Sequence, residues 1–300
     1  MPKDGWGVTV GFPIISYKEV TTMSLFDFFK PVPSISPDEV REYIKKNLPG
    51  DFCLLDVRQP VEYEQGHLPG ARLVPLHELP SRIRELDTEK TTIVYCRSGN
   101  RSRSAAGLLM SAGIKNVLNM EGGILRYNGI VASGPPEAGM FCFPESLTPG
   151  QLTAVAWFLE DGTIRFLEHI QENIHSDESP AIIRELLEAK NAHKVTLEKL
   201  YTGLTRESPS ADFPGDVLDV PAEEVMVGCI KVSEAMQWSR DKTLTDVLEL
   251  LITLGANSYD LYLKLGRTVK SEEAGRIFNL LAEEEGRNID HISSAFEKTL

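Results

Sequence analysis

The sequence lacks long apolar runs, closely spaced cysteine pairs and any excess of basic residues. It contains 300 residues, of which 42% are hydrophobic, and no stretch reaches the roughly 18 uninterrupted apolar residues that a membrane-spanning helix requires. Its four cysteines, Cys53, Cys96, Cys142 and Cys229, lie far apart and form no CxxC pair, which excludes a disulfide framework and a zinc knuckle. These absences predict a soluble protein with reduced cysteines and a cytoplasmic location.

Acidic residues are concentrated in the second half of the chain. The formal net charge is -13. Residues 36–132 carry 13 Lys and Arg against 12 Asp and Glu, whereas residues 151–300 carry 15 against 27. The segment between them, residues 133–150, is rich in proline and glycine and is typical of a linker. We therefore predict two domains, and the acidity of the second argues against binding to nucleic acid or to an anionic membrane.

Residues 1–35 form an N-terminal extension to the first predicted domain. The beginning of this extension shows no signal-peptide pattern, because Gly11 and Pro13 interrupt its short apolar stretch. The codons of Lys18-Glu19-Val20 are compatible with a bacterial ribosome-binding sequence just before Met23. We therefore expect translation to start at Met23 and the residues before it to pack poorly.

Helical and strand patterns alternate at short intervals after Ser36. Ser36 followed by Pro37 is typical of a helix start, and the apolar residues of the segment 36–47 fall on one face. Residues 52–57 and 91–96 are short apolar runs that predict buried parallel strands, each ending where such a sheet places its active site. This order predicts an α/β domain with a parallel sheet flanked by helices.

One tight loop carries a cysteine at the end of the second strand. Residues 96–102, CRSGNRS, connect this strand to a helix predicted from residue 102 onward. Backbone N–H groups of a short glycine-containing loop, the amino end of the helix and the charges of Arg97 and Arg101 together form a site for an anion. The same field lowers the pKa of Cys96 and favours its thiolate. The sequence therefore predicts that Cys96 is a nucleophile that acts on an anionic substrate.

Three segments resemble single-domain rhodaneses in order and spacing. They are residues 54–71 (LLDVRQPVEYEQGHLPGA), the loop 96–102 and residues 121–131 (EGGILRYNGIV), within a resemblance that covers residues 36–132. The resemblance implies that Cys96 takes a sulfane sulfur from a donor such as thiosulfate and releases sulfite. The persulfide then passes its sulfur to a thiol or cyanide acceptor, without a cofactor. The resemblance also implies that the substrate is bound by Arg97, Ser98, Gly99, Asn100 and Arg101.

The support of this loop and its length also follow from the sequence. Asp56, Arg58 and Glu62 match the DVR…E signature of rhodaneses, and we interpret them as structural, with an ion pair between Arg58 and Glu62. Only four residues separate Cys96 from Arg101, whereas related phosphatases have five. A shorter loop makes a smaller cradle, which favours sulfur over a phosphoryl group.

Beyond residue 150 the chain shows long helical patterns and no strand pattern. Four stretches of some 20 residues carry apolar stripes at helical spacing, with one long connection at about residues 203–242. Residues 159–170 align with 254–265, and residues 186–197 align with 281–292, both at an offset of 95. The repeat predicts a duplicated helical hairpin, and the four stretches predict an all-α four-helix bundle.

The repeated hairpin resembles the rubrerythrin branch of the ferritin-like proteins, in which each hairpin supplies one Glu and one Glu-x-x-His motif to a di-iron centre. Two carboxylates and one imidazole beside an ammonium group cannot neutralise two irons. We therefore expect the metal site to be degenerate, with Lys190 between Glu160 and Glu285. A single-metal or ligand pocket is the alternative. The six corresponding positions are Glu160, Lys190, His193, Gly255, Glu285 and Asn288.

These patterns lead to one function hypothesis and two alternatives. The first is a cytoplasmic thiosulfate sulfurtransferase that takes a small anionic sulfur donor and a thiol acceptor, with a helical bundle that docks, forms a homodimer or delivers a partner. The second is a sulfane-sulfur carrier or sensor without fast turnover, in which the bundle is the interaction module. In the third the bundle itself is the enzyme, which requires bound iron. Cys142 and Cys229 are also candidates for accepting sulfur from Cys96, although such cysteines are more often incidental.

Overall fold

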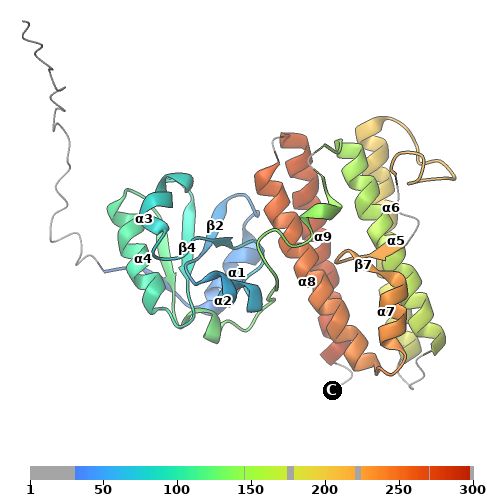
Figure 1. Ribbon diagram of the computed structural model, residues 1–300, viewed down its shortest axis with the longest axis horizontal. Helices are drawn as coiled ribbons and strands as arrows, with labels where there is room; N and C mark the ends of the chain where they lie inside the picture. Colours follow the sequence, from blue (N-terminus) through green and yellow to red (C-terminus); the bar gives the residue numbers. More distant parts are fainter. Residues whose placement is uncertain (1–30, 145, 174–178, 220–223, 270, 298–300) are drawn as a thin grey trace, which may run out of the picture. The chain divides into compact units, whose positions relative to one another are not determined.

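The computed structural model describes residues 31–144, 146–173, 179–219, 224–269 and 271–297 (Figure 1). The expectations about Met23 and the residues before it lie outside these ranges. The α/β region contains five strands, β1 (Ser34–Ile35), β2 (Phe52–Asp56), β3 (Arg72–Leu73), β4 (Thr91–Tyr95) and β5 (Val117–Met120). Its helices are α1 (Pro37–Lys46), α2 (Pro60–Gln65), α3 (Leu79–Arg82), α4 (Asn100–Ser111) and the 3-10 turns η2 (Ile83–Glu85) and η3 (Gly123–Arg126).

The five strands form one parallel sheet in the order β1-β5-β4-β2-β3. The strands β2 and β4, which the apolar runs predict, lie side by side in register, with Asp56 opposite Tyr95. The loops that follow Asp56 and Tyr95 therefore emerge at the same edge of the sheet. This arrangement confirms the predicted parallel α/β fold.

Each face of the sheet is covered by helices, which gives two apolar layers. One layer packs Leu55 and Val94 of the strands against Ala105 and Leu109 of α4. The other packs Leu54, Ile93 and Tyr95 against Val40 of α1 and Tyr63 of α2. Strands buried on both faces explain why their sequences are continuous apolar runs without alternation.

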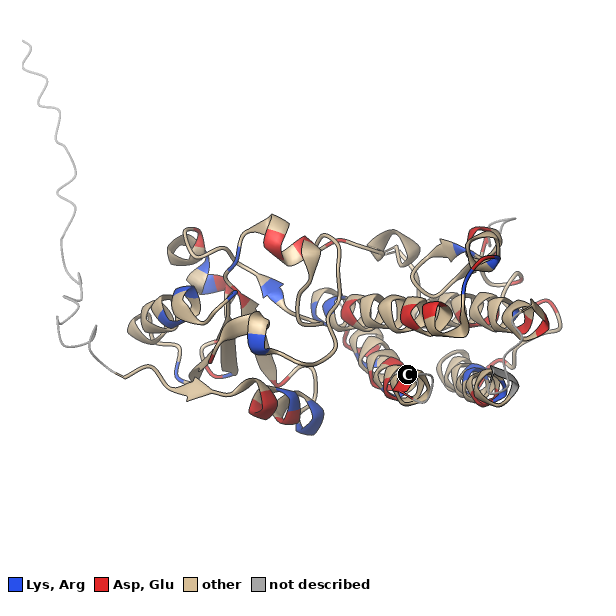
Figure 2. Cartoon of the chain, turned by 90° about the horizontal axis from the view of Figure 1, so that it is seen from below, with Lys and Arg blue, Asp and Glu red and all other residues tan. Residues whose placement is uncertain are grey.

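Helix α1 begins where the sequence predicts. The Ser36 hydroxyl accepts the N–H of Glu39, and the Glu39 carboxylate accepts the N–H of Ser36, so two N–H groups at the helix start are satisfied by side chains. Acidic residues occupy the first turn and basic residues the last (Figure 2). Charges of these signs interact favourably with the helix dipole and stabilise the helix.

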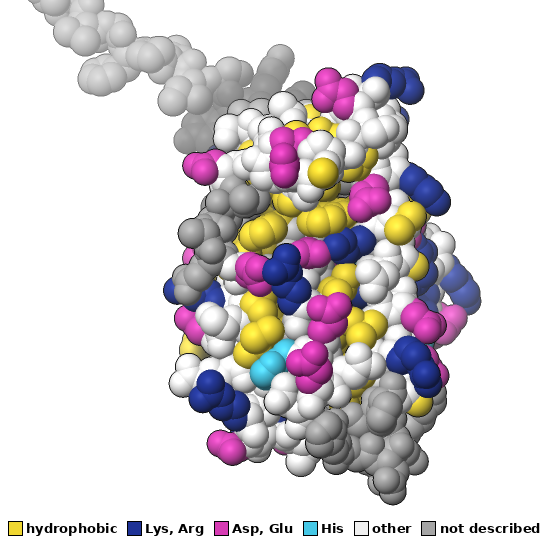
Figure 3. Space-filling model, turned by 90° about the vertical axis from the view of Figure 1, so that its right-hand side faces the viewer, with side chains coloured by type: hydrophobic (Ala, Val, Ile, Leu, Met, Phe, Trp, Pro, Cys, Tyr) yellow, Lys and Arg dark blue, Asp and Glu magenta, His cyan; other side chains and the backbone are white. Residues whose placement is uncertain are grey.

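The helical region contains four long helices, α5 (Pro149–Asn173), α6 (Ser179–Thr205), α8 (Leu244–Thr268) and α9 (Glu272–Glu297). Helix α5 packs along α6, and α8 packs along α9 (Figure 1). All four contribute to one apolar core that includes Phe166, Ile183, Leu248 and Phe278. None of the described helices is long and apolar enough to cross a membrane. Figure 3 shows acidic, basic and hydrophobic side chains interspersed on one face of this region.

The connection between α6 and α8 differs from the prediction, because it contains strands. A two-stranded antiparallel ribbon, β6 (Val225–Met226) and β7 (Ile230–Lys231), precedes the short helix α7 (Val232–Ser239). Strands of two residues are too short to give a recognisable apolar alternation in the sequence. The ribbon lies against α5, where the Val227 N–H donates to the Thr163 hydroxyl at 3.2 Å.

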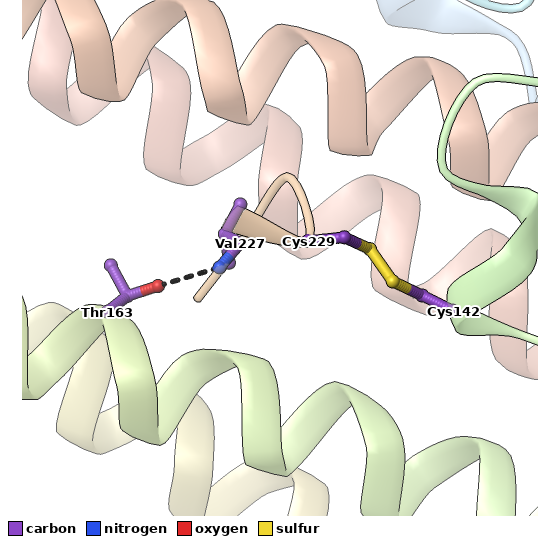
Figure 4. Close-up of a disulfide and its surroundings, with 4 residues drawn as sticks. All are labelled: Cys142, Thr163, Val227 and Cys229. Atoms are coloured by element: carbon purple, nitrogen blue, oxygen red, sulfur yellow. Dashed lines mark hydrogen bonds between the residues drawn. A yellow bond between two sulfur atoms is a disulfide. The ribbon is translucent and has the colours of Figure 1, made fainter. Parts of the chain in front are cut away.

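Part of the segment predicted as a linker, residues 133–150, packs against the helical region. Phe143 is buried in the core of the helical region, next to the turn η4 (Met140–Cys142). Cys142 forms a disulfide with Cys229 (Figure 4). The expectation of reduced cysteines is therefore wrong for this pair, because cysteines 87 residues apart in the sequence are brought together by the fold. Cys53 and Cys96 are free.

Helix α8 contacts the α/β region at the turn before β3. The Gly70 N–H donates to the Asp260 carboxylate at 2.8 Å, and the Arg267 guanidinium donates to the Gly70 carbonyl at 2.5 Å. Asp260 also lies 3.3 Å from His67 Nε2 and forms an ion pair with Lys264. Asp260, Lys264 and His67 are buried, so their side chains depend on these partners for stabilisation, whereas Arg267 is exposed.

The contact between the ribbon and α5 leads to the first prediction. A methyl group on Gly162 would lie 2.2 Å from the Val225 carbonyl oxygen, which belongs to the backbone and cannot move aside cheaply. Gly162→Ala should therefore lower the free energy of unfolding by about 1–3 kcal/mol. The measurement is urea denaturation followed by circular dichroism.

Gly203 is the matched control, because it also lies in a long helix and a methyl group on it would meet no atom within 4 Å beyond its neighbours and its own helix backbone. Gly203→Ala should be neutral or should stabilise the protein by up to about 1 kcal/mol. Equal effects of the two substitutions would contradict the close packing of the ribbon on α5.

Candidate active site

Cys96 directly follows β4, and three loop residues later α4 begins at Asn100. The Cys96 side chain is 1% exposed, and its sulfur accepts the N–H of Gly99 at 3.1 Å. The Ser102 hydroxyl lies 3.5 Å from the same sulfur. Burial by itself raises the pKa of the Cys96 thiol, but the hydrogen bonds from Ser102, Ser98 and Gly99 outweigh it and lower this pKa. The loop thus favours the thiolate, as the sequence predicts.

The turn η3 holds this loop from the other side. The N–H groups of Ile124 and Leu125 donate to the carbonyl oxygens of Cys96 and Arg97, at 2.9 and 3.1 Å. A methyl group on Gly123 would lie 2.3 Å from the Cys96 carbonyl oxygen, so only glycine permits this approach. With its carbonyls bonded to η3, the loop turns N–H groups toward the Cys96 sulfur.

Arg101 and Glu62 form a two-pronged ion pair beside the loop. The two terminal nitrogens of Arg101 lie 2.7 and 2.6 Å from the two carboxylate oxygens of Glu62. The Arg101 guanidinium lowers the pKa of Glu62 to about 2. The pair connects the start of α4 to α2. It also corrects the predicted ion pair between Arg58 and Glu62, because a residue 39 positions away in the sequence takes the place of Arg58.

Arg58 is instead paired with Asp56. Its guanidinium nitrogens lie 2.6–3.0 Å from the Asp56 carboxylate, and one of them also donates to the Gly66 carbonyl at 2.6 Å. The side chains are 5% and 0% exposed. The chain bends after β2 and places the Arg58 side chain against the Asp56 carboxylate, two positions earlier. Arg58 therefore pairs with Asp56 and not with Glu62. The supporting role of Asp56 and Arg58 stays an interpretation.

The remaining residues of the predicted cradle differ in exposure. Gly99 is buried and has φ of 94°, a conformation that favours glycine. Arg97, Ser98 and Asn100 are exposed. Within the part of the chain that the structure describes, Arg97 has no ion pair, so its guanidinium is available to an anion at the loop, whereas that of Arg101 is neutralised by Glu62.

Sequence reasoning overlooked Ser102 and Asn119. The Ser102 hydroxyl lies 2.6 Å from the Asn119 side-chain oxygen, and both side chains are almost fully buried. Ser102 belongs to the CRSGNRS loop motif, so its closeness to Cys96 had a sequence signal. Asn119 lies on β5 within an apolar run, and a polar residue in a strand that is otherwise buried is the signal that could have found it.

In the helical region the structure brings together the predicted degenerate positions. The Lys190 ammonium lies 3.1 Å from Glu160 and 3.8 Å from Glu285, and His193 Nδ1 lies 3.0 Å from Glu160. Gly255 lies against the Glu285 carboxylate, with Asn288 also buried nearby on α9. Within the described ranges, no three His, Cys, Asp or Glu side chains are grouped so as to bind a metal ion.

The pKa values of this cluster follow from burial and from Lys190. Burial alone would raise the pKa of Glu160, but the Lys190 ammonium and His193 outweigh burial and lower the pKa to about 2. Burial raises the pKa of Glu285, which lies farther from Lys190. The ammonium is thus the positive charge that keeps a buried carboxylate ionised.

The buried Asp56–Arg58 pair leads to the second prediction. Arg58→Ala leaves the Asp56 carboxylate buried without its partner, which should cost about 3–5 kcal/mol of unfolding free energy. Arg82 is the control, because its ion pairs with Glu78 and Glu85 are at least one third exposed. Arg82→Ala should cost no more than about 1 kcal/mol in the same denaturation experiment. A loss below that value for Arg58→Ala would show that the pair does not stabilise the fold.

Comparison with known proteins agrees with this geometry. A family model for the rhodanese-like domain matches residues 36–129. The chain is 42% identical over 77 residues to a protein of Allochromatium vinosum named sulfurtransferase, and covers 72% of it with 26% of its own length. It is 35% identical over 95 residues to the thiosulfate sulfurtransferase GlpE of Pseudomonas putida, and covers 81% of that protein with 32% of its own length.

A third relative is the uncharacterized protein YqhL of Bacillus subtilis, which is 41% identical over 76 residues. The match takes 25% of this chain and covers 60% of YqhL, which is less than two thirds of that protein. The names of the first two relatives support sulfur transfer as the general activity. Through its rhodanese-like domain, the chain belongs to the rhodanese-like family.

Proposed function

We propose that the protein is a sulfurtransferase of the thiosulfate type that carries a sulfane sulfur on Cys96. The observation that supports this most directly is the Cys96 sulfur itself, which is held at the end of β4 by hydrogen bonds that favour its thiolate. The thiolate attacks the outer sulfur of thiosulfate and forms an S–S bond. The S–S bond of thiosulfate breaks, and sulfite leaves with its electron pair. A thiol or cyanide acceptor then takes the sulfane sulfur, and Cys96 returns to the thiolate.

The charges around the loop suit a small anionic donor. Arg97 is exposed and supplies a full positive charge, and the 12-residue helix α4 points its amino end at the loop. Arg101 contributes less charge than the sequence suggests, because Glu62 neutralises it. We therefore propose that Arg97 and the backbone of Ser98, Gly99 and Asn100 bind the donor, and that Arg101 mainly orients the loop. No metal or organic cofactor is needed for this chemistry.

A second function is favoured by the burial of the nucleophile. Cys96 is only 1% exposed, so an acceptor reaches it slowly unless the loop opens. A protein that loads sulfur and keeps it until a partner arrives would be a sulfane-sulfur carrier or sensor. In this alternative the helical region is the interaction module.

The third prediction tests Cys96. Cys96→Ser should abolish both sulfur loading and sulfur transfer, because it removes the thiolate with little change in volume. After exposure to thiosulfate, intact-mass spectrometry should detect the addition of one sulfur atom to the unmodified protein and none to the variant. Cys53→Ser is the control and should load normally, since burial raises the pKa of Cys53 and disfavours its thiolate. Loading of the Cys96→Ser protein would refute the assignment.

Steady-state kinetics with thiosulfate and cyanide distinguish the enzyme from the carrier. An enzyme should turn over repeatedly at rates well above that of the uncatalysed reaction. A carrier should give one burst, stoichiometric with protein, followed by negligible turnover.

We also propose that the helical region is a ferritin-like four-helix bundle that lost its di-iron centre and serves in docking or in a homodimer. The support is the cluster in which Lys190 lies between Glu160 and Glu285, at the positions where the 95-residue repeat aligns ligands. An ammonium group at this place supplies the positive charge that metal ions would otherwise supply.

The fourth prediction follows from this cluster. Lys190→Ala leaves two buried carboxylates without their cation and should lower the unfolding free energy by about 3–5 kcal/mol. Lys199 is the control, because it lies on the same helix and is exposed. Lys199→Ala should change stability by less than about 0.5 kcal/mol. Stoichiometric iron in the purified protein, measured by elemental analysis, would contradict the proposal whatever the stabilities are.

A further inference from the structure

Ser102 and Asn119 form a buried polar pair beside Cys96. Ser102 lies in the first turn of α4 and is 0% exposed, and Asn119 lies on β5 and is 1% exposed. The Ser102 hydroxyl oxygen is 2.6 Å from the Asn119 side-chain oxygen and 3.5 Å from the Cys96 sulfur. One hydroxyl group thus lies between two acceptors.

A serine hydroxyl has a single hydrogen, so it donates to one of these acceptors at a time. Both acceptors lie within hydrogen-bond reach of the hydroxyl, and the shorter contact, to Asn119, is the stronger one while the sulfur is uncharged. To donate to the sulfur, only the hydrogen has to rotate about the bond between Cβ and Oγ, because the oxygen is already within reach of both acceptors. Hydrogen bonds to a charged acceptor are stronger than those to a neutral one, so a negative charge on the sulfur should turn the hydroxyl toward Cys96.

We propose that Ser102 is a catalytic residue whose hydroxyl hydrogen moves between Asn119 and the Cys96 sulfur as the charge on that sulfur changes. Asn119 is a positioning residue that competes for the same hydrogen. While Cys96 is a thiol or a persulfide, the hydroxyl donates to Asn119. When Cys96 is a thiolate, the hydroxyl donates to its sulfur.

The inference rests on the proposed sulfur transfer and names a group that assists it. When an acceptor thiolate forms a bond to the sulfane sulfur, the S–S bond to Cys96 breaks and its electron pair stays on Cys96. The negative charge therefore develops on the atom that Ser102 is able to reach. The N–H of Gly99 is a fixed donor to this sulfur at 3.1 Å, and the hydroxyl adds a donor that follows the charge.

The fifth prediction uses the pH dependence of Cys96 alkylation by iodoacetamide, read by peptide mass spectrometry so that Cys53 is counted separately. The midpoint is the pH at which the alkylation rate of Cys96 is half its maximum. Ser102→Ala removes the hydroxyl donor and should raise this midpoint by about one pH unit, as expected for one hydrogen bond to a charged group. Asn119→Leu removes the competing acceptor and should move the midpoint downward. The double variant should match Ser102→Ala, because Asn119 acts only through Ser102.

Ser104→Ala is the control, because Ser104 is exposed on the same helix two residues farther along. It should leave the midpoint unchanged. If Asn119→Leu does not fold, Asn119→Ala tests the same competition. An unchanged midpoint in Ser102→Ala, or an upward shift on replacing Asn119, would overturn the inference.

Alkylation does not require sulfur transfer, so the two proposals fail separately. The expected shifts in a protein that does not load sulfur would contradict the proposed function and support the role of Ser102. Normal sulfur loading with unshifted midpoints would support the proposed function and contradict the role of Ser102.

Discussion

The loop that carries Cys96 depends on two backbone hydrogen bonds from the turn η3 to the carbonyls of Cys96 and Arg97. A short loop between a buried strand and a helix must satisfy its carbonyl groups without water. Because the N–H groups of η3 donate to these carbonyls, the N–H groups of the loop can face the Cys96 sulfur. The close approach of Gly123 to the Cys96 carbonyl is therefore a requirement of this loop and explains why residue 123 is glycine.

Near this loop, the charge that an arginine can offer to an anion depends on whether a carboxylate is already paired with it. Arg58 is neutralised by Asp56, and Arg101 by Glu62, so of these two arginines and Arg97 only the last offers its charge to an anion. The buried cluster of the helical region follows the same rule, because Lys190 is shared by two carboxylates. In each place a charge removed from water is kept only where a partner is near.

The contact between α8 and the turn at Gly70 joins the two regions through polar groups. Asp260 accepts a backbone N–H and faces both His67 and Lys264, while Arg267 donates to the Gly70 carbonyl. Buried polar contacts have strict geometry, so they favour one arrangement of the two elements more than apolar packing alone would. The rhodanese-like segment of residues 66–71 is thus also a surface that α8 recognises.

Local patterns were sufficient to predict much of this protein. The parallel strands β2 and β4, the capped start of α1, the four long helices and the position of Cys96 at a strand end all follow from periodicity, capping residues and glycine placement within short windows. The 95-residue repeat also predicted which buried residues of the helical region meet, because repeated helical hairpins place equivalent positions together.

Partner choice was decided only by the tertiary structure. Glu62 pairs with Arg101 instead of Arg58, Cys142 pairs with Cys229, and Ser102 pairs with Asn119. These partners lie 39, 87 and 17 positions apart in the sequence. The sequence indicates which polar groups will be buried and will need a hydrogen-bond or ion-pair partner, because an unpaired buried polar group is costly. It does not state which of several candidates comes within about 3 Å, because that distance is set by how the sheet, the loop and the helices pack.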